Sequence, residues 1–192
     1  MSDVHHTLQQ IFHETSTAHQ RFAESKLDLI ASAAAIIGRA LQEGRKVLAF
    51  GNGGSASDAQ HLVAELVGRF EVEREALAGI ALTTDSAVVT AIANDYGYER
   101  VFARQVEGLG QQGDVAFGIS TSGHSQNVLN AFASAKARGL TTIALTGRDG
   151  GPIGAQADIH INVAERSTPR VQEVHRTILH AMCSVIEQRF TK

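Results

Sequence analysis

The sequence has little of several features that mark particular classes of protein. It contains a single cysteine, Cys183, in an apolar, helix-like stretch, so a disulfide framework within the chain is excluded and we expect a buried structural thiol. It has only 2 prolines beside 18 glycines and is 43% hydrophobic, which is typical of a globular domain and not of a disordered chain. Its formal net charge is only −3 and its basic residues are scattered, so the charge gives no reason to expect nucleic acid or an anionic membrane surface as a partner.

Long apolar runs are also missing. No stretch approaches the roughly 18 apolar residues that a membrane span needs, and residues 1–20 lack the basic start and apolar run of a signal peptide. A chain of 192 residues usually forms one domain, and no linker or change of composition divides this one. We therefore predict a single domain over residues 1–192 of a soluble, cytoplasmic protein.

The spacing of apolar residues predicts a regular alternation of strands and helices. An N-terminal helical region in two parts, about 4–24 and 27–44, is expected to precede five strands. The expected strands are the apolar runs at 46–51, 79–84, 114–120, 141–147 and 158–163. The expected later helices are about 55–68, 86–95, 98–110, 126–138 and 169–190, the last with Thr168 as N-cap and Pro169 in its first position. This order predicts an α/β fold with a five-stranded, mostly parallel sheet and helices on both faces.

In such a sheet, ligands bind at the carboxyl ends of the strands, so the turns that follow the strands are where we expect the chemistry. The first of these turns, "GNGGSA" at 51–56, matches the G-x-G-x-x-A form of a dinucleotide-binding loop. Such a loop needs an acidic residue about 20 positions further on. Asp85 follows only after about 30 positions, and Glu71 and Glu73 precede the expected strand. The loop also lacks the Gly-Lys-Ser/Thr of a Walker A motif, so a nucleotide is disfavoured.

A second turn is rich in hydroxyl groups. The segment "GISTSGHSQN" at 118–127 puts Ser120, Thr121, Ser122 and Ser125 between a strand and a helix. Hydroxyls, free backbone N–H groups and a helix N-terminus can together bind a phosphate dianion without any basic residue. Ordinary turn and cap chemistry is the alternative, because serine is common at such positions. A cap needs one hydroxyl and not four, so the pattern favours a phosphate site.

Two helices carry acid and imidazole groups. His61 and Glu65 are four positions apart and share a helix face, so they could bind one divalent metal ion or act as a proton-transfer pair. On the last helix, Gln172 and His180 lie on one broad side, while His175 points elsewhere and is expected to pack or to face solvent. The alternatives are an exposed polar contact for the first pair and a core histidine for His180. With the serine-rich turn, these residues suggest a small phosphorylated ligand and proton transfer next to a carbonyl through an enediolate.

The chain resembles the sugar isomerase (SIS) domain family and, within it, the phosphoheptose isomerases, also called sedoheptulose 7-phosphate isomerases. The resemblance covers nearly the whole chain and is carried by the segments "GNGGSASDAQHLVAELVGRF", "IANDYG", "GDVAFGISTSGHSQNV", "ALTGRDGG" and "RVQEVHRTILH". It implies a flavodoxin-like core and a homotetramer with active sites shared between subunits, in which residues 1–44 take part in oligomer packing. It also implies an aldose–ketose isomerase that interconverts sedoheptulose 7-phosphate and D-glycero-D-manno-heptose 7-phosphate, the first step toward the heptose of lipopolysaccharide or a related surface glycan.

The resemblance further implies roles for individual residues. Glu65 would be the catalytic base and His180 the acid. The phosphate would be bound by Ser55, Ser120, Ser122 and Ser125, and the rest of the sugar by Asn52, Gly53, Arg69, Asp95, Thr121 and Gln172. One zinc ion per subunit would be bound by His61, Glu65, Gln172 and His180. Because a metal-bound carboxylate is a poorer base, one or more of these ligands would have to release the metal during turnover.

One position departs from the family pattern. Pro169 stands where some members have an acidic residue, so a sugar contact by that acid is not expected here. A non-catalytic relative, which binds the bacterial replication initiator protein, lacks the acid and imidazole that are Glu65 and His180 in this chain. A sugar-phosphate-sensing SIS module of a regulator usually comes with a DNA-binding domain, which this sequence is not expected to contain. The sequence therefore favours the enzyme over the binding protein and the regulator.

Overall fold

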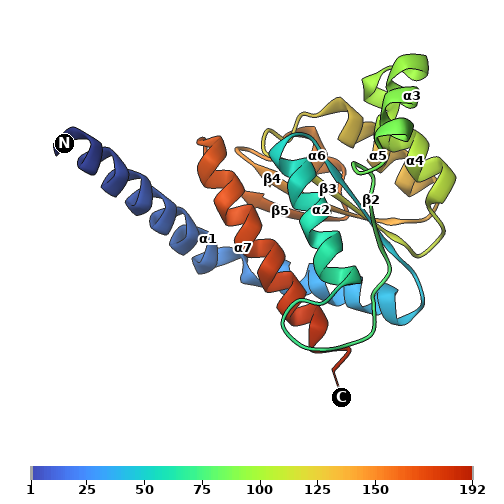
Figure 1. Cartoon of the computed structure of the whole chain (residues 1–192), viewed down its shortest axis with the longest axis horizontal. Coiled ribbons are helices and arrows are strands. Elements are labelled where there is room, and N and C mark those ends of the chain that lie inside the picture. The colour runs from blue at the N-terminus through green and yellow to red at the C-terminus, as the bar shows by residue number, and fades with distance from the viewer. Residues whose placement is uncertain (1, 192) are drawn as a thin grey trace.

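The structure, a computed structural model, describes residues 2–191 as a parallel sheet surrounded by helices (Figure 1). The strands are β1 (Val47–Gly51), β2 (Gly79–Ala81), β3 (Val115–Ser120), β4 (Thr141–Gly147) and β5 (Ile159–Val163). The helical elements are α1 (Ser2–Gln42), α2 (Gly54–Val67), α3 (Ser86–Tyr96), the 3₁₀ turn η1 (Tyr98–Arg100), α4 (Val101–Leu109), α5 (Gln126–Ala137), α6 (Gly151–Gln156) and α7 (Thr168–Glu187). The strands form one sheet in the order β2-β1-β3-β4-β5, and every pairing is parallel. The predicted five-stranded α/β fold is confirmed.

Helices cover both faces of the sheet, which is why the central strands are apolar along their whole length. Along β1, Val47 and Ala49 point into a core shared with α1, α2 and α7, whereas Leu48 and Phe50 point into a second core shared with α4 and α5. These side chains, like Phe117 on β3, are fully buried. Figure 1 shows α2 and α7 side by side on the same face of the sheet, where they are in contact. The sheet thus supports two helices that carry predicted site residues.

The strand order also shows where a ligand would bind. In the order 2-1-3-4-5, the chain leaves β1 toward one edge of the sheet and leaves β3 toward the other. Sheets of this kind bind their ligands outside the carboxyl ends of the two strands where the direction changes. The turns after β1 and β3 contain residues 52–53 and 121–125, the glycine-rich and serine-rich segments. The topology therefore brings together the two turns that the sequence indicated.

The N-terminal helix α1 is continuous, so the predicted division into two helices is wrong. Glu24 and Ser25 are exposed, whereas Phe22 and Ile30 on either side of them are buried. The polar run therefore belongs to the solvent face of one long helix, and neither Gly nor Pro occurs between Phe22 and Ile30. The first turns of α1 project away from the rest of the chain (Figure 1). From Ile11 onward the helix also contacts α7, where Arg170 donates to the carbonyl of Ile11 and the Thr15 hydroxyl donates to Glu173.

Other boundaries differ from the prediction in smaller ways. β2 ends at Ala81 because the chain turns there, with the N–H of Thr84 donating to the carbonyl of Ala81 over 3.3 Å. α6 was not predicted, since six residues are too few to show a helical period. α7 begins at Thr168 with Ser167 in the N-cap position, so the predicted cap is one residue late, and the helix ends at Glu187. Within residues 2–191, no helix is both long enough and apolar enough to cross a bilayer.

Candidate active site

The serine loop, residues 120–125, gathers its hydroxyl groups at the end of β3. Ser120 Oγ lies 3.0 Å from Ser125 Oγ and 3.4 Å from Ser122 Oγ. The backbone N–H of Gly123 donates to Ser120 Oγ over 3.2 Å. Ser125 is the N-cap residue of α5, but within the described chain its side chain makes no capping hydrogen bond. The hydroxyls therefore lie together at a helix N-terminus without serving as its cap, an arrangement suited to a phosphate group.

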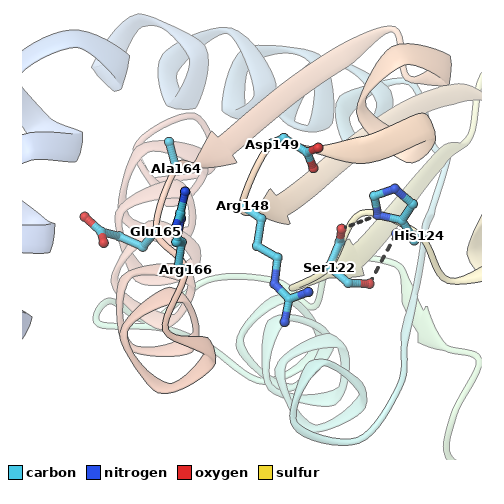
Figure 2. Close-up of a pocket in the computed structure, with 7 residues that line it drawn as sticks. All are labelled: Ser122, His124, Arg148, Asp149, Ala164, Glu165 and Arg166. Atoms are coloured by element: carbon cyan, nitrogen blue, oxygen red, sulfur yellow. Dashed lines mark hydrogen bonds between the residues drawn. The ribbon is translucent and has the colours of Figure 1, made fainter.

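The serine loop packs directly on the turn after β4. Gly123 has a φ of 71°, and a Cβ there would lie 2.3 Å from the carbonyl oxygen of Gly150, so only glycine fits. The carbonyl of Gly123 accepts a hydrogen bond from the N–H of Ile153 over 3.1 Å. Thr121 is part of the same contact, because a Cβ on Gly147 would lie 2.6 Å from its carbonyl oxygen. A cavity of about 630 Å³ adjoins these turns and is lined by Ser122, His124, Arg148, Asp149, Ala164, Glu165 and Arg166 (Figure 2).

The turn after β1 brings α2 close to α7. Gly53 has a φ of 55°, a left-handed conformation that glycine adopts without strain. A Cβ on Gly54 would lie 2.2 Å from Nε2 of Gln172, so this glycine lets Gln172 of α7 approach the backbone of the turn. Ser55 follows in the first turn of α2 and is buried. The turn therefore joins two of the predicted substrate-binding side chains, Ser55 and Gln172.

An ion pair connects α2 and α7 near this turn. Oδ1 of Asp58 lies 2.7 Å from a terminal nitrogen of Arg176. Burial raises the pKa of the Asp58 carboxyl, and Arg176 opposes this shift. The two residues line a cavity of about 480 Å³ together with Gly54 and Gln172. Polar groups of both helices thus surround a space large enough for part of a sugar.

His61, Glu65 and His180 meet between α2 and α7. Nε2 of His61 lies 2.7 Å from Nε2 of His180 and 3.4 Å from Oε1 of Glu65. Burial lowers the pKa of His61, Arg176 lowers it further, and Glu65 raises it, so the neutral imidazole is favoured. The ring of Phe70 packs against that of His180, with 5.5 Å between the centroids. A carboxylate and two imidazoles in contact can take up and release protons at a bound molecule.

Asn52 is held by two residues that the sequence did not single out. Asn52 and Asn127 form a reciprocal pair, in which each Nδ2 donates to the other Oδ1 over 2.9 Å. The hydroxyl of Tyr98 also donates to Oδ1 of Asn52, over 3.0 Å. Since Asn127 is on α5 directly after the serine loop, this pair connects the turn after β1 with the turn after β3. No sequence signal could reveal it, because the two asparagines are 75 positions apart.

Comparison with known proteins agrees with this geometry. Residues 10–147 match the SIS domain family. The phosphoheptose isomerase of Sulfurimonas denitrificans is 56% identical over 144 residues, which are 75% of this chain and 74% of that protein. The phosphoheptose isomerase of Aquifex aeolicus is 49% identical over 181 residues, which are 94% of this chain and 95% of that protein. The structure of the phosphoheptose isomerase from Neisseria gonorrhoeae matches with a TM-score of 0.92 at 44% identity and covers 96% of this chain and 99% of that one. The chain belongs to the phosphoheptose isomerase family.

Two of the residues predicted to contact the sugar, Arg69 and Asp95, lie apart from the other site residues. Arg69 is exposed and is engaged by the segment that follows it, donating to the carbonyl of Glu71 over 3.2 Å and lying 3.7 Å from Glu73. Asp95 is exposed on α3, where its carboxylate accepts a hydrogen bond from the side chain of Asn94. No hydrogen bond or ion pair within residues 2–191 joins either of them to the serine loop or to His180. Their sugar contacts stay predictions.

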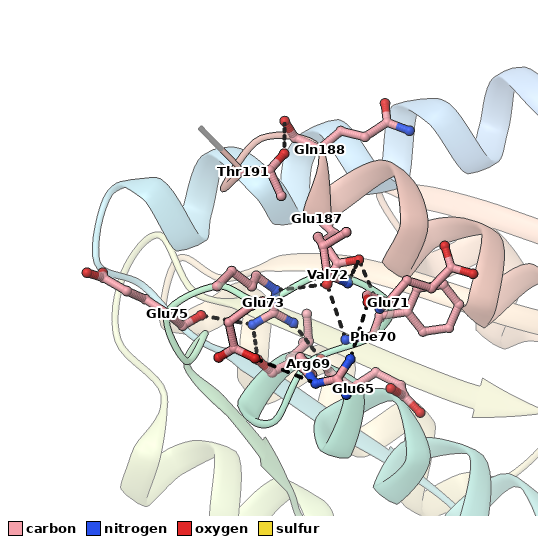
Figure 3. A network of polar contacts seen from close by, with 12 residues as sticks. Glu65, Arg69, Phe70, Glu71, Val72, Glu73, Glu75, Glu187, Gln188 and Thr191 are labelled. Atoms are coloured by element: carbon pink, nitrogen blue, oxygen red, sulfur yellow. Dashed lines mark hydrogen bonds and ion pairs between the residues drawn. The ribbon is translucent and has the colours of Figure 1, made fainter.

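A buried carboxylate that the sequence did not indicate anchors the segment next to His180 (Figure 3). Glu187, at the end of α7, accepts hydrogen bonds from the N–H groups of Phe70, Glu71 and Val72 over 3.0 to 3.2 Å. Its Oε1 also lies 3.5 Å from Nε of the buried Arg74. In this phosphoheptose isomerase, the position of Phe70 against His180 therefore depends on Glu187. A glutamate in the last turn of a helix is indistinguishable in sequence from an exposed one.

The predicted zinc ligands of this phosphoheptose isomerase are only partly in contact. His61, Glu65 and His180 supply two nitrogens and one oxygen, which are donors that Zn²⁺ prefers. With the two Nε2 atoms hydrogen-bonded, one of them carries a proton that metal binding would displace. Gln172 lies against Gly54, and within residues 2–191 no group of three His, Cys, Asp or Glu side chains is arranged to hold a metal ion. The donor chemistry fits zinc, and the observed arrangement is that of a hydrogen-bonded cluster.

Proposed function

We propose that this phosphoheptose isomerase converts sedoheptulose 7-phosphate to D-glycero-D-manno-heptose 7-phosphate, the first step toward the heptose of a surface glycan. The observation that carries the proposal is the cluster of His61, Glu65 and His180 beside turns suited to a phosphorylated sugar. Relatives that are 49% and 56% identical carry the name phosphoheptose isomerase. That the reaction takes place in the cytoplasm stays a prediction.

In the proposed mechanism, the serine loop holds the substrate's phosphate and Glu65 removes a proton from C1. The electron pair forms the C1–C2 double bond, and the oxygen on C2 takes a proton from His180 to give an enediol. His180 then takes a proton from the C1 hydroxyl, which becomes the aldehyde, while Glu65 returns its proton to C2. Four proton transfers, two through each residue, thus move the carbonyl from C2 to C1 without any external oxidant or reductant.

Zinc belongs to the proposal on the strength of the donor set. His61, Glu65 and His180, with Gln172, would hold it, and a bound zinc ion would act as a Lewis acid on the substrate's oxygens. The protein's own groups still have to position the sugar and move the protons. Glu65 and His180 have both tasks in this scheme, so exchange between ligand and proton-transfer roles is part of the proposal.

The proposal includes a homotetramer with shared active sites, and the apolar surface of α1 supports the part of it that concerns packing against another subunit. Val4, Leu8 and Phe12 are four residues apart, so they share one helix face, and they are 64%, 48% and 72% exposed. A projecting helix with an uncovered apolar stripe is suited to packing against another subunit. We infer that the first turns of α1, with Val4, Leu8 and Phe12, form part of the subunit interface.

The non-catalytic relative that binds the replication initiator protein is the alternative function. It is not favoured, because the carboxylate and imidazole that it lacks are both present here, with Glu65 and His180 next to His61.

The deciding experiment measures turnover of sedoheptulose 7-phosphate by the purified chain supplied with zinc. Glu65→Gln and His180→Gln are each expected to lower kcat by at least about 10³-fold, since each removes a positioned proton-transfer group. Glu43→Gln changes the same residue type as Glu65→Gln at an exposed position and should leave kcat unchanged. Full activity in both site variants would refute the mechanism, and an inactive wild type would support the binding protein instead.

A further inference from the structure

Arg148 stands at the cavity beside the serine loop in an unusual backbone conformation. Its φ is 56°, and no other non-glycine residue within 2–191 has a positive φ. Residues with a Cβ rarely adopt this left-handed conformation, because the Cβ approaches the following carbonyl. The N–H of Arg148 donates to the carbonyl of Glu165 over 3.2 Å, and its own carbonyl accepts from Nδ2 of Asn162 over 3.1 Å. The backbone around β5 therefore holds Arg148 in this strained conformation, and such strain is common at functional sites.

The side chain of Arg148 faces the serine loop. Ser122 and Arg148 line the same cavity, and Figure 2 shows the guanidinium extending toward Ser122, with Arg166 on the other side of Arg148. The two turns that carry them are in direct backbone contact through Gly123 and Gly150. Arg148 is thus positioned by its backbone to reach the Ser122 side of the loop.

The acidic side chains that line the cavity are occupied by other partners. Glu165 forms an ion pair with Arg21 of α1. Oδ1 of Asp149 accepts a hydrogen bond from the N–H of Gly151 over 3.2 Å. Among the described residues, none forms an ion pair with Arg148, so its charge is left facing the cavity.

The serine loop contains no Lys or Arg side chain. Its hydroxyl and backbone N–H groups are neutral, whereas a phosphate monoester carries about −1.5 to −2 charges at pH 7. A guanidinium offers a planar pair of N–H donors that matches two phosphate oxygens, and such charge-assisted hydrogen bonds are about twice as strong as neutral ones. A guanidinium beside Ser122 therefore adds a permanent positive charge that the hydroxyl and backbone N–H groups do not provide.

We propose that Arg148 binds the phosphate of the sugar phosphate at the Ser122 side of the serine loop. Arg148 is then a substrate-positioning and specificity-determining residue that selects phosphorylated over unphosphorylated sugars. The inference rests on the proposed function, because it takes the substrate's phosphate to lie in the serine loop.

Arg148→Gly is the sharpest test, because glycine suits a positive φ and the variant loses the whole side chain, guanidinium included, without added backbone strain. We expect a melting temperature equal to or above that of the wild type and a KM for sedoheptulose 7-phosphate raised about tenfold. The kcat should change less than about twofold, since the contact is made equally in the ground state and the transition state. The Kd for inorganic phosphate, measured by calorimetry, should also rise about tenfold, and Arg148→Lys should recover part of the loss.

Arg166→Gln is the matched control, because it removes a charge from the same cavity on the side away from Ser122. Its KM should rise less than about twofold. Wild-type KM and phosphate affinity in Arg148→Gly would overturn the inference, and so would an equal rise of KM in both variants or a wild type that binds no phosphate. A wild type without turnover would overturn the proposed function instead, and the phosphate titration would still decide the role of Arg148.

Discussion

Glu187→Gln tests the buried carboxylate that ties the end of α7 to the segment after α2. Glu187 is only 4% exposed and accepts three backbone N–H groups, those of Phe70, Glu71 and Val72. It is also the ion-pair partner of Arg74, whose side chain is 2% exposed. Glutamine keeps the shape of the side chain but turns an NH₂ group toward these donors. The variant therefore loses one acceptor and leaves the charge of Arg74 uncompensated.

The size of the effect follows from these contacts. Removing one partner of a buried ion pair costs about 3–5 kcal/mol, because the other charge stays buried without compensation. Arg74 keeps hydrogen bonds to the carbonyls of Leu66 and Glu75, both 2.9 Å long, so the lower end of this range applies. We expect the free energy of unfolding to fall by about 3 kcal/mol, a large part of the about 5–15 kcal/mol that stabilises a typical domain.

The pH dependence provides an independent check on the charge. Burial alone would raise the pKa of the Glu187 carboxyl, but the three backbone N–H groups and Arg74 outweigh it and hold that pKa below its ordinary value. A carboxyl with a lowered pKa in the folded state stabilises the fold above its unfolded-state pKa and loses this contribution as the pH falls through the folded-state value. The difference between wild type and variant should therefore be complete at pH 7 and shrink below about pH 4.

Urea unfolding at pH 7 and at about pH 3.5 measures both effects. Glu43→Gln, an exposed change of the same residue type, should stay within about 0.5 kcal/mol of the wild type. A loss below about 1 kcal/mol at pH 7, or the same loss at both pH values, would refute the account of Glu187 as a charged acceptor.

Three further predictions concern other parts of the chain. Gly123→Ala should lower the free energy of unfolding by about 2 kcal/mol and weaken phosphate binding, because Gly123 has a φ of 71° and an added Cβ would meet Gly150. The control Gly108→Ala has open space around the added Cβ and should change neither quantity. Equal melting temperatures of the two variants would contradict this prediction. Cys183 should resist iodoacetamide at pH 8 in the folded protein and react with it in urea. Burial, and to a smaller extent the nearby Glu65, raises the pKa of its thiol to about 12 in the folded state. Rapid labelling of the native protein would contradict this prediction. Phe12→Ser should yield a smaller assembly in light scattering while the helix content of the chain is kept, and an unchanged molecular mass would remove Phe12 from the interface.

Most secondary structure could be predicted because buried parallel strands are short apolar runs that end at glycine or at a polar turn. β3 and β4 match the predicted ranges to within a residue for this reason. The division of α1 failed because the polar run at Glu24 and Ser25, on the exposed face of a long helix, has the composition of a loop. The apolar runs alone could not predict the strand order, which only the resemblance to a flavodoxin-like core implied.

The local part of the site follows from the order of the residues alone. A spacing of four predicted that His61 and Glu65 share a helix face, and one short loop contained Ser120, Ser122 and Ser125. These contacts lie within single elements, where backbone geometry alone sets which side chains are neighbours.

Which distant residues meet depends on how the elements pack together. His61 and His180 are 119 positions apart, and Glu187 anchors Phe70 from 117 positions away. Periodicity tells the direction in which a side chain leaves its own element, but its partner depends on how that element packs against the others. The sequence therefore determined the helices and the chemical groups that they carry, and the packing of α7 on α2 brought those groups into one site.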